Sequence, residues 1–162
     1  MSGVTIATRI DDKAVMRGFE TLIRRGGDPR PALEEIGDML IADIQGRFMR
    51  EEDPEGRPWA PSRRAEEEGG QTLTDNAVLR NSFTKEVDSD GVTVGTAEIY
   101  AAIHNFGGII EPKHGEYLMF SSGGRFFCVK KVEMPQRTFM GFTDENARAA
   151  LEIVSDNLEM GL

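Results

Sequence analysis

Apolar side chains recur every three or four residues in the first third of the chain, a spacing that predicts amphipathic helices. The longest stripe runs from Leu33 to Phe48. Pro31 suits the first helical position, so we expect a helix over residues 31–50. A shorter stripe follows Asp12, whose side chain can cap a helix at its N-terminus. Two helices are therefore expected before residue 51.

Three more helices are expected later in the chain, the first of them a short helix over residues 75–82. Residues 98–106 carry apolar side chains at helical spacing, and the glycine pair at 107–108 is a common helix end. Thr143 is expected to cap the last helix, since two acids follow it where the helix dipole favours them. Its buried stripe is predicted to consist of Ala147, Leu151, Val154 and Leu158.

Alternating apolar and polar residues separated by turn residues predict two hairpins, one turning at residues 88–91 and one at 121–124. A similar alternation over residues 4–10 indicates an N-terminal strand or extended arm. Helices and hairpins grouped in blocks favour an α+β fold. We expect a single domain over residues 1–162, with an antiparallel sheet built from two hairpins, packed with N-terminal helices and a C-terminal helix.

Residues 51–72 are rich in charge, proline and glycine, and Trp59 is almost their only large apolar residue. This composition predicts a long, acidic surface loop, a kind of segment that is often functional. Trp59 has two interpretations. It either pins the loop to the body of the protein or anchors it on a neighbouring subunit.

The 162 residues carry a net charge of −9, with the acidic surplus in residues 51–68 and 144–162. Lys and Arg form no run that would grip nucleic acid without sequence preference. The single cysteine, Cys128, excludes an internal disulfide and is expected to be buried in its strand. No stretch is long and apolar enough for a membrane span, and residues 1–15 do not resemble a signal peptide.

Few residues indicate catalysis. His104 and His114 have no metal-ligand spacing, and phosphate-binding and nucleophile motifs are absent from the sequence. The many carboxylates leave a glycosidase-like acid pair open.

Four short elements carry a resemblance to a known family. They are DPEGRPWAP at 53–61 with Phe48 ahead of it, LTDNAVLRNSF at 73–83, YAAIHNFGG at 100–108 and MPQRTFMGFT at 134–143. In this order they resemble the phage virion morphogenesis, or tail-completion, family of the Mu-like group. In the second element Asp75-Asn76 stand where Thr-Gly is usual, so the backbone there is expected to differ.

The resemblance implies a structural phage protein, without catalytic activity or cofactor, that completes the tail or forms part of the neck joining tail to head. The implied partners are copies of itself in a ring, commonly of six subunits, and other tail or neck proteins. DNA would pass through the channel without specific binding, which suits an acidic lining that includes Glu152 and Asp156. The implied location is the virion, after assembly in the host bacterial cytoplasm. Two alternatives stay open beside this role: a tail-associated cell-wall hydrolase, which is the main enzymatic alternative, and a transient assembly chaperone.

The residues expected at subunit or partner contacts are Trp59, Tyr100, His104, Phe106, Arg137, Phe139 and Met140. We expect Phe139 to pack inward against the helix at 100–106. Arg137 is expected to meet a carboxylate or main-chain carbonyls of the same or an adjoining subunit, because an unpaired buried guanidinium is costly. His104 is expected to be half-buried, bonded to a loop carbonyl and packed on Tyr100.

Overall fold

The computed structural model describes residues 12–24, 27–88, 91–122 and 124–160. The strand expected over residues 4–10 lies outside these ranges. The helices are α1 (Lys13–Arg24), α2 (Arg30–Arg50), α3 (Arg63–Glu68), α4 (Val78–Asn81), α5 (Ala101–Phe106) and α6 (Asp144–Met160). The strands are β1 (Thr84–Val87), β2 (Val92–Gly95), β3 (Gly108–Ile110), β4 (Leu118–Ser122), β5 (Arg125–Val129) and β6 (Val132–Met134). The α+β class is confirmed.

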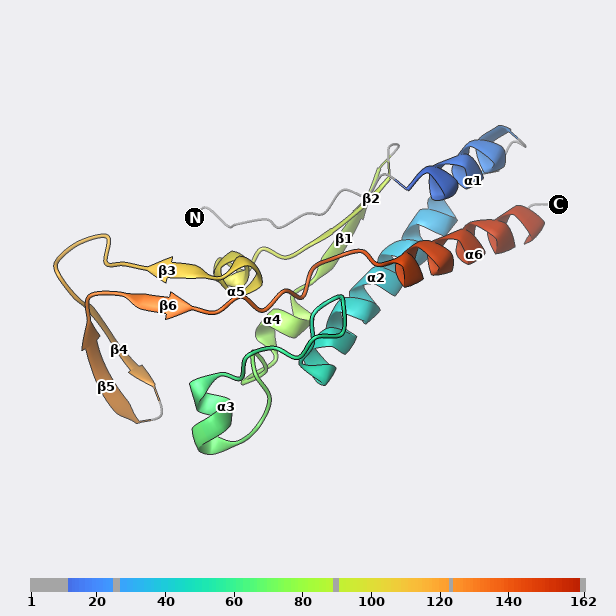
Figure 1. Ribbon diagram of the computed structural model, residues 1–162. Coiled ribbons are helices and arrows are strands. Elements are labelled where there is room, and N and C mark those ends of the chain that lie inside the picture. The colour runs from blue at the N-terminus through green and yellow to red at the C-terminus, as the bar shows by residue number, and fades with distance from the viewer. Residues whose placement is uncertain (1–11, 25–26, 89–90, 123, 161–162) are drawn as a thin grey trace.

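Helices α1, α2 and α6 pack together at one end of the molecule (Figure 1). The expected caps are present: Asp12 Oδ1 accepts the N–H groups of Ala14 and Val15 at 2.8 and 3.0 Å, and Thr143 Oγ1 accepts the N–H of Asn146. A small core between these helices is built from Ala32, Ile36, Ala150 and Val154. The buried face of α6 is therefore rotated about the helix axis from the predicted stripe. Asn146, Ala150 and Val154 are buried, whereas Ala147, Leu151 and Leu158 are only half-buried.

The main core lies in the middle of the molecule, where the C-terminal half of α2 meets α4, α5 and the β1–β2 hairpin. It consists of Ile44, Phe48, Trp59, Leu79, Phe83, Val94, Ala101, Phe139 and Met140. The Phe48 ring is its centre, with ring centroids 5.4 Å from Trp59, 6.1 Å from Phe83 and 5.1 Å from Phe139. Aromatic side chains from four separate segments thus hold this core together.

In the described residues the strands form three separate antiparallel pairs, β1–β2, β3–β6 and β4–β5. Both predicted hairpins are present, as β1–β2 and β4–β5. The single sheet expected to contain them is not. The pairing of β3 with β6 was not predicted, because a three-residue strand that begins with glycine carries no alternating signal.

The molecule is elongated, and residues 108–134 extend from the core as an arm (Figure 1). The β3–β6 pair forms the root of the arm, and the β4–β5 hairpin forms its far end. The three-helix end and the far end of the arm lie at opposite extremes of the molecule. Because of this separation, surfaces at these two ends of one chain cannot contact each other.

The description of residues 51–72 as a surface loop needs correction. Helix α3 lies within them, capped by Ser62 Oγ, which accepts the N–H of Ala65. Thr72 is buried, its N–H is bonded to the Glu51 carboxylate, and its hydroxyl accepts the N–H of Ser62. These polar bonds attach the segment to the body of the protein, and an apolar pattern cannot reveal them.

Helix α5 is shorter than the helix predicted over residues 98–106. Ile99 and Phe106, two of the apolar residues at helical spacing, are both exposed. The helix begins at Ala101 and instead buries Ala101 and Asn105. A small residue and an amide face the protein here, because the next segments of chain approach α5 closely.

Candidate functional site

Three of the four sequence elements that carry the family resemblance meet around the fourth. Its residues 135–143 form a short segment that we call the junction. It runs from the end of β6 to the start of α6 and thus links the arm to the three-helix end. The first element contributes Trp59, Ala60 and Pro61, the second Leu79 and Phe83, and the third Asn105. Elements that lie tens of residues apart in sequence are therefore parts of one structural unit.

Arg137 joins the junction to the first element. Its Nε donates to the Ala60 carbonyl at 2.6 Å and its Nη2 donates to the Pro61 carbonyl at 3.1 Å. The residue is only 4% exposed, and burial lowers the pKa of its guanidinium. The expectation that Arg137 meets main-chain carbonyls is confirmed, and both carbonyls belong to its own chain.

Asn105 was missed by the sequence analysis and is central to the site. Its Oδ1 accepts the N–H groups of both Phe139 and Met140 at 3.0 Å, and its side chain is almost fully buried. The His104 carbonyl accepts the N–H of Arg137 at 2.8 Å. An asparagine between a histidine and a phenylalanine gives no periodic signal, although a polar residue on the buried side of a short helix points to such a bond.

Arg47 holds the other side of the junction and was also missed. Its Nη1 donates to the carbonyls of Phe139 and Gly141 at 2.9 and 3.0 Å, and its Nη2 forms an ion pair with Asp43. Asn146 donates to the same Asp43 carboxylate at 3.0 Å. The charge of a buried arginine is thus balanced within the chain, as burial requires. The junction is clamped from α2, α5 and α6 at once.

The large side chains of the predicted site face inward. Phe139 is fully buried, as predicted, and Met140 is buried beside it in the main core. Trp59 is 7% exposed and its Nε1 donates to the Thr138 carbonyl at 3.0 Å. These positions support the interpretation that Trp59 pins residues 51–72 to the body, and they leave little of its side chain for a neighbouring subunit.

Tyr100 and Phe106, at the two ends of α5, are exposed, and His104 is half-buried. The Tyr100 and His104 rings pack edge to face with centroids 6.1 Å apart, as expected for this pair. His104 Nδ1 is buried and has no hydrogen-bond partner among the described residues, so the expected bond to a loop carbonyl is missing. Burial, and after it the charge of Arg137, lowers the pKa of His104. Both effects favour the neutral imidazole.

A cleft of about 300 Å³ opens beside His104. It is lined by Ser62, Arg64, Leu73, Asp75, Asn76, Leu79, Tyr100 and His104. Asp75 is the one carboxylate in this lining, and it lies 3.7 Å from Arg64. An acid pair of the glycosidase kind needs two carboxylates that face each other. The described residues also hold no group of three or more His, Cys, Asp or Glu side chains placed to bind a metal ion.

The arm carries six of the thirteen exposed large hydrophobic side chains of the described chain. The large exposed side chains on it are Ile109, Ile110, Tyr117, Met119, Phe120 and Phe126. Cys128 is exposed too, contrary to the prediction that it is buried, because the hairpin has nothing packed on that side. An apolar patch of this kind marks an interaction surface on many proteins.

The backbone of the second element corrects one detail of the resemblance. The left-handed residues here are Leu73 and Ala77, with φ of 59° and 57°, and not Asp75-Asn76. When the element is aligned on Leu79 and Ser82, Ala77 occupies the position of the usual glycine. The positive φ explains why glycine is favoured there.

Comparison with known proteins supports the same grouping. The phage virion morphogenesis family matches residues 10–159. The chain belongs to this family. Over 91 residues it is 33% identical to Mu-like prophage FluMu G protein 2 of Haemophilus influenzae, a match that covers 56% of this chain and 54% of that protein. The chain thus spans about half the length of the curated relative it matches. No solved structure matches the chain.

Membership of the virion morphogenesis family indicates a role in phage virion assembly, and a structural part more than an enzymatic one. It implies a virion-associated protein. Among the described residues no helix has the length and apolar character needed to cross a membrane. The family's sequence elements are used here to build the junction, and the exposed arm is the surface they hold in place.

Proposed function

We propose that this protein is a structural component that completes the phage tail or forms part of the neck joining tail to head. Family membership supports the virion role. The observation that carries the rest is the arm, a rigidly rooted extension with an exposed apolar surface. An enzyme concentrates its polar residues around a substrate site. In this chain buried polar side chains instead form hydrogen bonds that hold the junction at the root of the arm.

The proposed partners are copies of the same chain, arranged in a ring, and neighbouring proteins of the tail or neck. Tyr100, His104 and Phe106 belong to the proposed contact surface because they lie at the root of the arm. The net charge of −9 suits a passage for DNA, since like charge keeps phosphates from sticking.

The test is a phage that carries a null allele of this gene, complemented from a plasmid. Without complementation, lysates should contain filled heads and tubes that are not joined or not finished, visible by electron microscopy. Restored infectivity with the wild-type gene is the control. Normal, joined particles in the null lysate would contradict the proposal.

Two alternatives have their own outcomes. A tail-associated cell-wall hydrolase would clear a band at the mass of this chain in a zymogram on peptidoglycan. A transient assembly chaperone would be absent from purified virions by mass spectrometry. We expect no cleared band and a stoichiometric signal in the virion.

A further inference from the structure

The β4–β5 hairpin has one apolar face that no described residue covers. Its register pairs Met119 with Cys128 and Ser121 with Phe126, which places these four side chains on one face. Met119 and Phe126 are 70% and 69% exposed. The opposite face is partly covered, because Phe120 stacks on Phe127 and the Arg63 guanidinium lies over the Phe127 ring. A two-stranded hairpin is marginally stable alone, so the bare face indicates a partner.

The same hairpin, taken with the three residues after it, is cationic. Residues 118–132 contain Arg125, Lys130 and Lys131 and no acidic residue, with Glu116 and Glu133 just outside them, whereas the whole chain has a net charge of −9. Within the described part of the chain, none of these three side chains forms an ion pair. A partner surface that is acidic would therefore both attract and orient the hairpin.

Helix α6 provides such a surface. Glu145, Glu152, Asp156 and Glu159 fall on one face at 3.6 residues per turn, all exposed, opposite the buried Ala150 and Val154. Arg148 is the one base of α6 on this face, so the face keeps an acidic surplus. No ion pair to these four carboxylates occurs among the described residues. Beside α6, helix α1 exposes Met16 and Ile23, which can cover apolar side chains of the hairpin.

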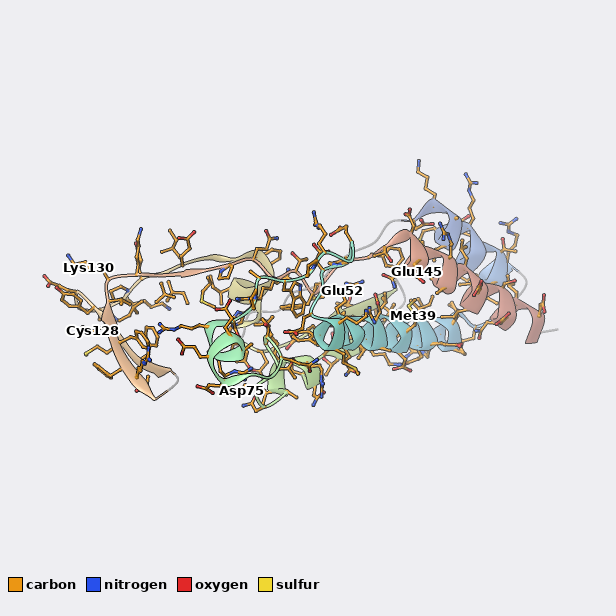
Figure 2. All side chains as sticks on the ribbon, turned by 60° about the horizontal axis from the view of Figure 1, so that its bottom comes forward. Met39, Glu52, Asp75, Cys128, Lys130 and Glu145 are labelled. Atoms are coloured by element: carbon orange, nitrogen blue, oxygen red, sulfur yellow. The ribbon has the colours of Figure 1, made fainter. Side chains whose placement is uncertain are left out.

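The hairpin cannot reach α6 of its own chain. Cys128 and Lys130 lie at one extreme of the molecule and Glu145 lies toward the other (Figure 2). The two views agree on this separation. We propose that the β4–β5 hairpin of one copy docks on the acidic face of α6 of the next copy. Bases on α1, Lys13, Arg17 and Arg24, confine the cationic hairpin to the α6 side of that end.

This contact is head-to-tail, because it joins different surfaces of identical chains. Each copy can therefore bind the next, and the series of copies terminates when it closes into a ring. This inference rests on the proposed structural role and names the contact that builds the assembly. It also assigns Glu152 and Asp156 to a subunit contact, in place of the channel lining that their charge alone indicates.

The first test uses Cys128, the single cysteine of the chain. Glu152→Cys and Asp156→Cys are introduced separately, and assembled particles are treated with a short bismaleimide. Each variant should give a ladder of covalently linked copies on a denaturing gel. Glu35→Cys, an exposed acid on α2 at the same end of the molecule, is the matched control and should give no ladder. Cys128→Ser should abolish the ladder in both variants.

The second test exchanges the charges. Lys130→Glu with Lys131→Glu, or Glu152→Lys with Asp156→Lys, should each reduce joined particles at least tenfold, and the fourfold variant should restore most of them. Unchanged thermal melting of each purified variant shows that the fold is intact. A fourfold variant no better than either pair would overturn the proposal.

Other outcomes overturn it as well. Cross-linking of Cys128 to a different virion protein would show that the arm binds that protein. Intact assembly with slower DNA ejection in Glu152→Lys with Asp156→Lys would place the acidic face in the channel. Each of these results leaves the structural role standing, since that role fails only if the null phage makes normal particles.

Discussion

Arg137 illustrates, at the scale of single residues, how a motif residue can serve the fold. Because its guanidinium satisfies the buried carbonyls of Ala60 and Pro61, Arg137→Ala should lower the free energy of unfolding by about 2–4 kcal/mol. The sequence analysis placed Arg137 among the expected subunit or partner contacts. Arg63→Ala, which removes an exposed ion pair with Glu67, should cost under about 1 kcal/mol. Equal denaturant midpoints for the two variants would contradict the structural role of Arg137.

Substitution of Phe139 should lower the free energy of unfolding at least as much. The side chain is fully buried against Phe48 and Phe83, so Phe139→Ala should cost roughly 3–5 kcal/mol in chemical unfolding. Phe139→Leu keeps most of the volume and should cost clearly less. Wild-type stability in Phe139→Ala would show that the junction is not part of the core.

Ala77 offers a stabilising change. Its φ of 57° is strained for a residue with a Cβ, so Ala77→Gly should raise stability by roughly 0.5–1 kcal/mol. Ala149→Gly, inside α6, is the control and should lower stability by about 1 kcal/mol. A loss of stability in both variants would mean that the left-handed turn at Ala77 is absent.

His104 should make stability depend on pH. Its pKa is lower in the folded chain than the unfolded value of about 6.5, so the unfolded chain binds the proton more readily. The stability that depends on neutral His104 is fully present above the unfolded pKa. It is lost as pH falls from that value through the lower pKa of the folded chain. Melting temperature should therefore drop less between pH 7.5 and 5.5 in His104→Gln than in wild type. His114→Gln, at an exposed position, is the control, and an identical drop in all three proteins would refute the assignment.

The root of the arm can be tested at the scale of elements. Gly107 has φ 69° and ψ −177°, a conformation nearly confined to glycine, and an added Cβ would lie 2.8 Å from the Gln136 nitrogen. Gly107→Ala should cost about 2–3 kcal/mol and expose Lys130 and Lys131 to faster tryptic cleavage. Gly115→Ala, with positive φ but open space, should leave cleavage unchanged. Equal cleavage in the two variants would show that β3–β6 pairing does not fix the arm.

Elements with a regular period could be predicted from the sequence. The α2 stripe and both hairpins follow from apolar spacing and turn residues, and the caps follow from Asp12 and Thr143. Helix α3 and strand β3 could not, because six charged or small residues and a three-residue strand carry no such period. Of the candidate site, the inward packing of Phe139 and the main-chain carbonyl partners of Arg137 were predicted. Asn105 and Arg47 were missed, since their importance lies in bonds to main-chain groups far away in sequence.

At the scale of the whole molecule, the arrangement of the elements decides function more than any single side chain. Pattern predicted the β4–β5 hairpin but not that the arm projects from the core, since projection depends on β3 pairing with β6 across that hairpin. An exposed apolar hairpin on a fixed root is unfavourable in an isolated subunit, because it leaves apolar surface in water. It is typical of a subunit of a larger assembly.

A cryo-electron microscopy map of the mature virion, centred on the end of the tail where it meets the head, tests this account most directly. We predict a closed ring of copies of this chain, with each β4–β5 hairpin seated on α6 of the next copy and DNA or an open passage at the centre. A map in which this region is fully explained by other proteins, with no density for this fold, would contradict the central claim.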